Sequence, residues 1–165
     1  MYNQSLVASL ISNNGVADTE AWAHRFVGNF ARKPEGNDRA QIMAVANGEA
    51  DIAIANSYYI GLMLSGKKGD EQRAAARKVN LHFPSQAGRG AHINVSGIGL
   101  MKNSPNKANA IKFIEFLLSD KAQEHIVNNT YEYPLSANVA PSDLIAQFGT
   151  GFKEDQTSVL HLFLL

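Results

Sequence analysis

A short apolar run followed closely by two adjacent tyrosines constrains the possible fold of this chain more than any other feature of its sequence. Residues 51–55 form an apolar segment with the length of a buried strand, and Asn56 and Ser57 interrupt it. Ser57 is a favourable N-cap for the short apolar helix that follows. Tyr58 and Tyr59 are therefore predicted to lie at a corner between a strand and a helix.

The predicted position of the tyrosines indicates a binding site. Neighbouring side chains on a strand point to opposite faces, so two adjacent phenols converge only where the backbone leaves the extended state. In open α/β sheets, ligands bind beyond the carboxyl ends of the strands, and a helix N-terminus there favours negative charge. A pair of phenolates suits a hard, highly charged cation such as ferric iron. The alternative is that both residues are ordinary half-buried rings with polar tips.

The composition narrows the function classes. The 165 residues are enough for one domain or for a part of a larger protein, and 15 basic residues balance 15 acidic ones. This balance indicates neither a nucleic-acid partner nor an anionic membrane surface. The absence of cysteine excludes disulfides, thiolate metal sites and a cysteine nucleophile. No apolar stretch is long enough to cross a membrane, and the sequence does not begin with the pattern of a signal peptide.

Helical and strand patterns alternate along the chain, which indicates an α/β fold. Strands are expected at 51–55, 78–84 and 92–96, with a flexible turn at 85–90 as the best internal boundary. Two helix N-caps are less obvious: Asp18 or Thr19 for the second helix, and Asp38 for the third, where Gln41 completes a capping-box variant. Helices are expected at 3–14, 17–33, 38–46, 57–64, 104–117 and 119–129, and Pro141 opens a last short helix.

The residues that could take part in catalysis are better explained by ordinary structural roles. The five histidines show no metal-ligand spacing, and no serine lies in a nucleophile-elbow pattern. A catalytic Tyr58 or Tyr59 would need a partner that lowers a phenol pKa from about 10, and none stands nearby in the sequence. A bound ferric ion supplies that shift itself, because its ligands bind deprotonated. We therefore do not expect an enzyme.

Nearly the whole chain, up to about Thr157, resembles the periplasmic ferric-iron-binding proteins of bacterial ABC transporters. The two tyrosines lie within a long flanking match rather than alone, so the resemblance is specific. The matching stretches are 2–6, 22–32, 36–39, 47–59, 83–84, 88–97, 110–119 with Gln123, and 132–135.

The resemblance implies a type II periplasmic-binding-protein fold, in which two α/β lobes are joined by a hinge and bind iron in the cleft. It assigns Tyr58 and Tyr59 as metal ligands, and Tyr2 as a third, because Tyr2 precedes a matching helix start. Asn56 and Ser57 are expected to orient a phenolate, a water or a small synergistic anion. Arg32 and Arg39 are weaker candidates for contact with the anion.

The same resemblance implies a truncated chain that lacks most of the first lobe. Residues 1–88 would belong to the second lobe with the tyrosine site, 89–139 would cross back to the first lobe, and 140–165 would return as a truncated C-terminal segment. The resemblance makes the chain a C-terminal fragment of the family's protein, and the apolar end at 159–165, which has no stop signal, is typical of a chain that ends inside an element. An uncovered apolar helix face would favour self-association; its residues are Ile111, Ile114, Phe116 and Leu117.

The function implied by the resemblance is that of a periplasmic solute-binding component of an ABC importer. It would capture Fe3+ through tyrosine phenolates and deliver it to a membrane permease, with water or a small anion completing the metal's coordination. An anion or a small organic solute, held at Asn56, Ser57 and the helix N-terminus, is the alternative ligand in the same fold.

Overall fold

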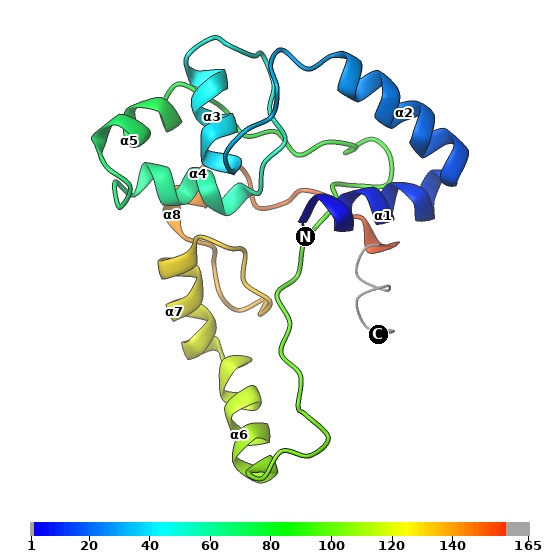
Figure 1. Cartoon of the computed structure of the whole chain (residues 1–165). Helices are drawn as coiled ribbons and strands as arrows, with labels where there is room; N and C mark the ends of the chain where they lie inside the picture. The colour runs from blue at the N-terminus through cyan, green and yellow to red at the C-terminus, as the bar shows by residue number, and fades with distance from the viewer. Residues whose placement is uncertain (1, 158–165) are drawn as a thin grey trace. The chain divides into compact units, whose positions relative to one another are not determined.

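The computed structural model describes residues 2–157, except for the side chain of Tyr2. Within this range the secondary structure consists of helices, and the β-structure is limited to an isolated parallel bridge between Ala91 and Glu154 (Figure 1). The apolar segment 159–165 lies outside the described residues. The helices are α1 (Tyr2–Asn14), α2 (Val16–Gly28), α3 (Asp38–Ala46), α4 (Ser57–Leu64), α5 (Asp70–Ala76), α6 (Lys107–Leu117), α7 (Asp120–Thr130) and α8 (Asp143–Ala146).

The described residues form two compact units, and the chain passes from one to the other four times. The first unit contains residues 2–34, 82–96 and 151–157. The second contains residues 35–81 and 97–150, and therefore all helices from α3 to α8. The predicted helices are thus present, but α2 ends at Gly28 and not at residue 33, and α6 begins at Lys107 and not at residue 104. Helix α5 was not predicted.

In the first unit, helices α1 and α2 pack against each other and are joined at Gly15. The segment after residue 82 is held to the segment after residue 151 by the backbone of Ala91, which donates to Lys153 O and accepts from Asp155 N, each at 2.8 Å. Gly90 has a φ of 104°, and a Cβ atom there would lie 2.6 Å from the carbonyl carbon of Glu154. Glycine is therefore required at this close approach.

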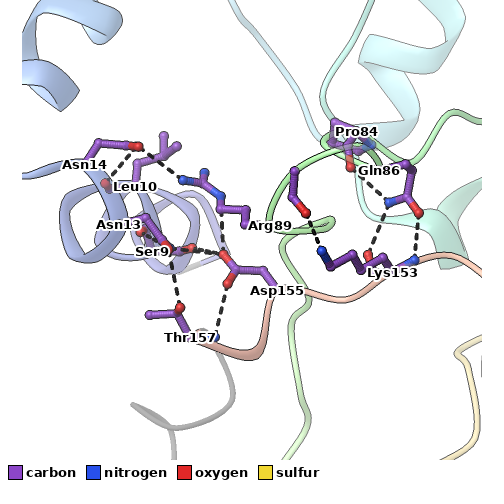
Figure 2. Close-up of polar contacts among 11 residues, drawn as sticks. Ser9, Leu10, Asn13, Asn14, Pro84, Gln86, Arg89, Lys153, Asp155 and Thr157 are labelled. Atoms are coloured by element: carbon purple, nitrogen blue, oxygen red, sulfur yellow. Dashed lines mark hydrogen bonds and ion pairs between the residues drawn. The ribbon is translucent and has the colours of Figure 1, made fainter.

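A buried carboxylate organises the polar interior of the first unit. Asp155 is 1% exposed and accepts hydrogen bonds from Asn13 Nδ2 at 3.1 Å and from the backbone N–H of Thr157 at 3.0 Å. The Arg89 side chain forms an ion pair with Asp155 and also reaches Asn14 Oδ1 (Figure 2). Burial raises the pKa of Asp155, but the hydrogen bonds from Ser9 and Thr157 and the charge of Arg89 outweigh it and lower that pKa below its usual range.

The core of the second unit is built around helix α4, which packs against α3, α5 and α8 (Figure 1). Met63 and Ile145 are fully buried, and Tyr131 lies against α4 at Gly61. A Cβ atom at Gly61 would lie 2.6 Å from the Tyr131 Cβ, so the missing side chain lets the ring approach the helix. Tyr58 and Tyr59 pack against this core from the first turn of α4.

Helix α6 carries the uncovered apolar face that the sequence predicts. No residue of α6 is buried within the described structure, and Ile111 and Phe116 are exposed, while Ile114 and Leu117 are partly covered. In Figure 1, α6 continues beyond α7, away from the core around α4. An apolar surface of this kind needs a partner to cover it.

The three predicted strands are not formed among residues 2–157. Segments 51–55, 78–84 and 92–96 contain no ladder, and Ile52 and Ile54 are exposed at 85% and 50%. The apolar pattern of a buried strand is present, but a strand forms only when a neighbour supplies the other half of its hydrogen bonds. The described residues offer these segments no such neighbour.

The N-caps predicted for α2, α3 and α4 are wrong, and for α4 the cap is Asn56 instead of Ser57. Helix α2 begins after Gly15, and Thr19 lies buried inside the helix, where its hydroxyl donates to Gly15 O at 2.8 Å. Helix α3 is capped by Asn37, whose side chain accepts from the N–H groups of Arg39 and Ala40. Asp38 is then the first helical residue, and its carboxylate accepts hydrogen bonds from Asn56 instead.

Candidate metal centre

Tyr58 and Tyr59 lie side by side on the first turn of α4. Their ring centroids are 4.4 Å apart, with the ring planes inclined at 34°. Adjacent residues of a helix normally point in different directions, so this pairing is a feature of the helix start. Both rings are half-buried, which gives each phenol an apolar support and leaves part of it accessible. The predicted corner is therefore present, although the segment before it forms no strand among the described residues.

The residue before the helix is held by a carboxylate from another element. Asn56 is the N-cap of α4 in an extended conformation, and its side chain does not cap its own helix. Its backbone N–H donates to Asp38 Oδ2 at 2.8 Å, and its side-chain Nδ2 donates to the same oxygen at 3.0 Å. Asn56 thus supports the corner, but both of these donors face a carboxylate of the chain itself.

The other predicted site residues belong to several segments of the chain, in both units. Ser57, predicted as the N-cap of α4, is instead its first residue, and Asn56 is the N-cap. Tyr2 begins α1 in the first unit, and its side chain is outside the described structure, so its role as a third ligand stays a prediction. Arg39 donates to Gln72 Oε1 at 3.1 Å, which ties α3 to α5, and Arg32 donates to the backbone of Lys33.

The remaining tyrosines of the second unit have structural roles. Tyr131 is buried against α4. The Tyr133 hydroxyl donates to Gly149 O at 2.8 Å, and burial raises the pKa of Tyr133 to about 12. The half-buried Tyr58–Tyr59 pair, in which two phenols lie side by side, is the better metal-binding candidate of this unit.

The described histidines and carboxylates form no alternative centre. Within residues 2–157 no three His, Asp or Glu side chains come together as metal ligands would. His92 lies 3.2 Å from Ser5 Oγ and 3.2 Å from Asn94 Oδ1. Burial lowers the pKa of His92, against the opposing effects of Asn94 and the Asp155 charge. Its contacts are those of an ordinary histidine of the first unit.

Comparison with known proteins identifies the family. The family of bacterial extracellular solute-binding proteins matches residues 1–124. The chain belongs to this family. Iron uptake protein A1 of Synechocystis sp. is 52% identical over 158 residues, which are 96% of this chain and 43% of that protein. No helix within residues 2–157 is long and apolar enough to span a bilayer.

Solved structures of solute-binding proteins share the fold. The Trichodesmium protein IdiA, or FutA, in complex with iron and citrate matches with a TM-score of 0.91 at 52% identity, over 96% of this chain and 49% of that one. The ferric binding protein from Campylobacter jejuni matches with a TM-score of 0.89 at 39% identity, over 97% and 51%. The chain spans about half the length of these relatives. The predicted type II periplasmic-binding-protein fold, an α/β class, is confirmed over that half.

Proposed function

We propose that this chain is part of a ferric-iron-binding protein that supplies iron to an ABC importer. The observation that carries the proposal is the Tyr58–Tyr59 pair on the first turn of α4, with ring centroids 4.4 Å apart. Membership of the solute-binding family supports it. The relatives' names, which refer to iron uptake and ferric binding, support it further.

The chemistry of the pair fits a ferric ion. Phenolate oxygen is a hard anionic donor, and Fe3+ is a small, hard cation, whereas softer metals prefer the thiolates that this chain lacks. The bound cation keeps both phenols deprotonated. The helix N-terminus contributes a partial positive charge that also favours phenolates.

Tyr58 and Tyr59 alone leave the ferric ion with an incomplete set of ligands. Tyr2 is the proposed third ligand, and water or a small anion fills the remaining positions. Citrate is a suitable anion, since it accompanies iron in the Trichodesmium structure. A chain that supplies so few of its own donors holds iron weakly, because hydrolysis and competing chelators act on the open positions.

The proposed setting is the bacterial periplasm, with a membrane permease as the partner and no catalytic step. In this account, residues 1–88 belong to one lobe together with the tyrosine pair. Residues 89–139 cross to the other lobe, and 140–165 return. The alternative ligand, an anion or small organic solute held by Asn56, has less support, because two donors of Asn56 already face Asp38.

An iron competition titration tests the proposal. The 165-residue chain is titrated with ferric nitrilotriacetate, and EDTA is then added as a competing chelator to measure the affinity. Tyr58→Phe and Tyr59→Phe keep the rings but remove an anionic ligand, so each should weaken binding at least about tenfold. Tyr133→Phe is the matched control, since that hydroxyl bonds to Gly149 O and should not affect iron. Equal affinity in the chain and both Tyr→Phe variants would contradict the proposal.

A further inference from the structure

A carboxylate on α3 holds the corner that carries the tyrosine pair. Asp38 Oδ2 accepts from both the backbone N–H and the side-chain Nδ2 of Asn56, at 2.8 and 3.0 Å, across 18 positions of sequence. Hydrogen bonds to an ionised carboxylate are about twice as strong as neutral ones. Two of them on one residue fix both its backbone and its side chain.

The N-terminus of α3 does not need the Asp38 carboxylate. Asn37 caps this helix and accepts from Arg39 N at 3.1 Å and from Ala40 N at 3.3 Å. The Asp38 side chain is therefore directed to Asn56 and not to its own backbone. Asn37 therefore caps α3, while its neighbour Asp38 holds Asn56.

The corner depends on support of this kind. Segment 51–55 precedes it without a strand partner within the described residues, and Ile52 and Ile54 are exposed. The direction of the backbone at Asn56 decides where Tyr58 and Tyr59 begin their helical turn. The contact with Asp38 fixes that direction relative to α3, because α3 and α4 pack against each other.

We propose that Asp38 is a positioning residue for the tyrosine pair, and that its carboxylate occupies at Asn56 the place where a free anion would otherwise bind. This inference rests on the proposed function, since the pair is taken as the ferric site. Asp38 acts through Asn56 and does not itself touch the metal. The chain thus supplies its own anion at this point of the site.

Two measurements on the 165-residue chain test the inference, with Asp38→Ala and Asp38→Asn as variants. Asp70→Ala is the matched control, because Asp70 is the first residue of α5 and exposed, as Asp38 is the first residue of α3. Amide hydrogen exchange at residues 56–59 without metal reports the corner directly. The visible ferric–phenolate band, recorded with and without added acetate, reports the site.

Asp38→Ala should speed exchange at residue 56 roughly tenfold or more, the effect of losing hydrogen bonds to a charged group. It should weaken ferric binding by a similar factor. Acetate should partly restore the band in Asp38→Ala but not change it in the unsubstituted chain. Asp38→Asn, which keeps an acceptor oxygen, should give a smaller loss, and it also serves if Asp38→Ala fails to fold.

Unchanged exchange in both Asp38 variants would overturn the positioning role. An equal loss of the band in Asp70→Ala, with no effect of acetate, would overturn it too. The proposed function fails separately, by the absence of any band in the unsubstituted chain. Hydrogen exchange without metal still decides the role of Asp38 in that case.

Discussion

Ser9 and Asp155 lie 146 positions apart in the sequence, and the Ser9 hydroxyl donates to Asp155 Oδ2 at 3.0 Å. This contact joins α1 to the segment that follows residue 151. Figure 2 shows Asn13, Arg89 and Thr157 converging on the same carboxylate. The first unit therefore depends on a polar centre more than on an apolar core, and that centre can be tested by mutation.

Asp155→Ala should destabilise the chain by about 2–3 kcal/mol, because it leaves the buried Ser9 hydroxyl without its acceptor and removes the partner of Arg89. Urea denaturation followed by far-UV circular dichroism measures the change. Glu154→Ala is the matched control, since Glu154 is exposed and forms its bridge through the backbone. Similar losses in both variants would show that the Asp155 side chain has no special role.

The stabilisation by Asp155 should depend on pH. Its pKa is lowered in the folded state, so between the folded and unfolded values the unfolded chain binds more protons and stability rises with pH. The contribution should be complete above the unfolded value of about 4 and should disappear as pH falls through the lower folded value. Urea midpoints of the chain and of Asp155→Asn, compared from about pH 7 to about pH 3, should draw closer together as the pH falls below about 4. A constant difference would contradict this.

Gly61→Ala should destabilise the second unit by about 1–3 kcal/mol, because the added methyl group overlaps with Tyr131 Cβ at 2.6 Å and Ile145 Cδ1 at 2.9 Å. Thermal unfolding measures the effect. Gly97→Ala is the control, since its Cβ would meet no atom within 4 Å and its φ is not positive. If both variants unfold at the same temperature, the packing of Tyr131 against α4 is not tight.

The 165-residue chain should self-associate through the exposed face of α6. Exchange of the segment from Arg89 to Asn138 between two copies would cover both apolar faces, which is the arrangement of a domain swap. Sedimentation velocity should show dimers or larger species, and Phe116→Asp should shift them toward monomer. Lys112→Asp places the same charge on another exposed α6 position as a control. A chain that stays monomeric at high concentration would refute the prediction.

Local sequence signals predicted most of the helices. Ser119 is the N-cap of α7, and its hydroxyl accepts from Ala122 N as such a residue should. The start of α3 was also predicted to within one residue. Asn37 and Asp38 are both good N-caps, and the sequence does not show which one the helix uses. Helix α5 was missed, although acidic Asp70 and Glu71 and an alanine run mark its start and body.

The contacts that depend on distant residues were not predictable. The apolar pattern of 51–55 marks a strand, but whether it pairs depends on neighbours that this pattern does not contain. The tyrosine corner was predicted from local sequence because Asn56, Ser57 and both rings are adjacent. The contact between Asp38 and Asn56 was not predicted, because Asp38 lies 18 positions earlier in the sequence. No local rule links an aspartate in the first turn of one helix to the N-cap of another.

The visible spectrum of the iron-loaded chain tests the central claim most directly, since a ferric ion bound by phenolates absorbs strongly there. The account predicts a band in the unsubstituted chain, a weaker or shifted band in Tyr58→Phe and in Tyr59→Phe, and loss of most of the band in the double variant. The same band in the double variant as in the unsubstituted chain would show that this pair does not bind the iron.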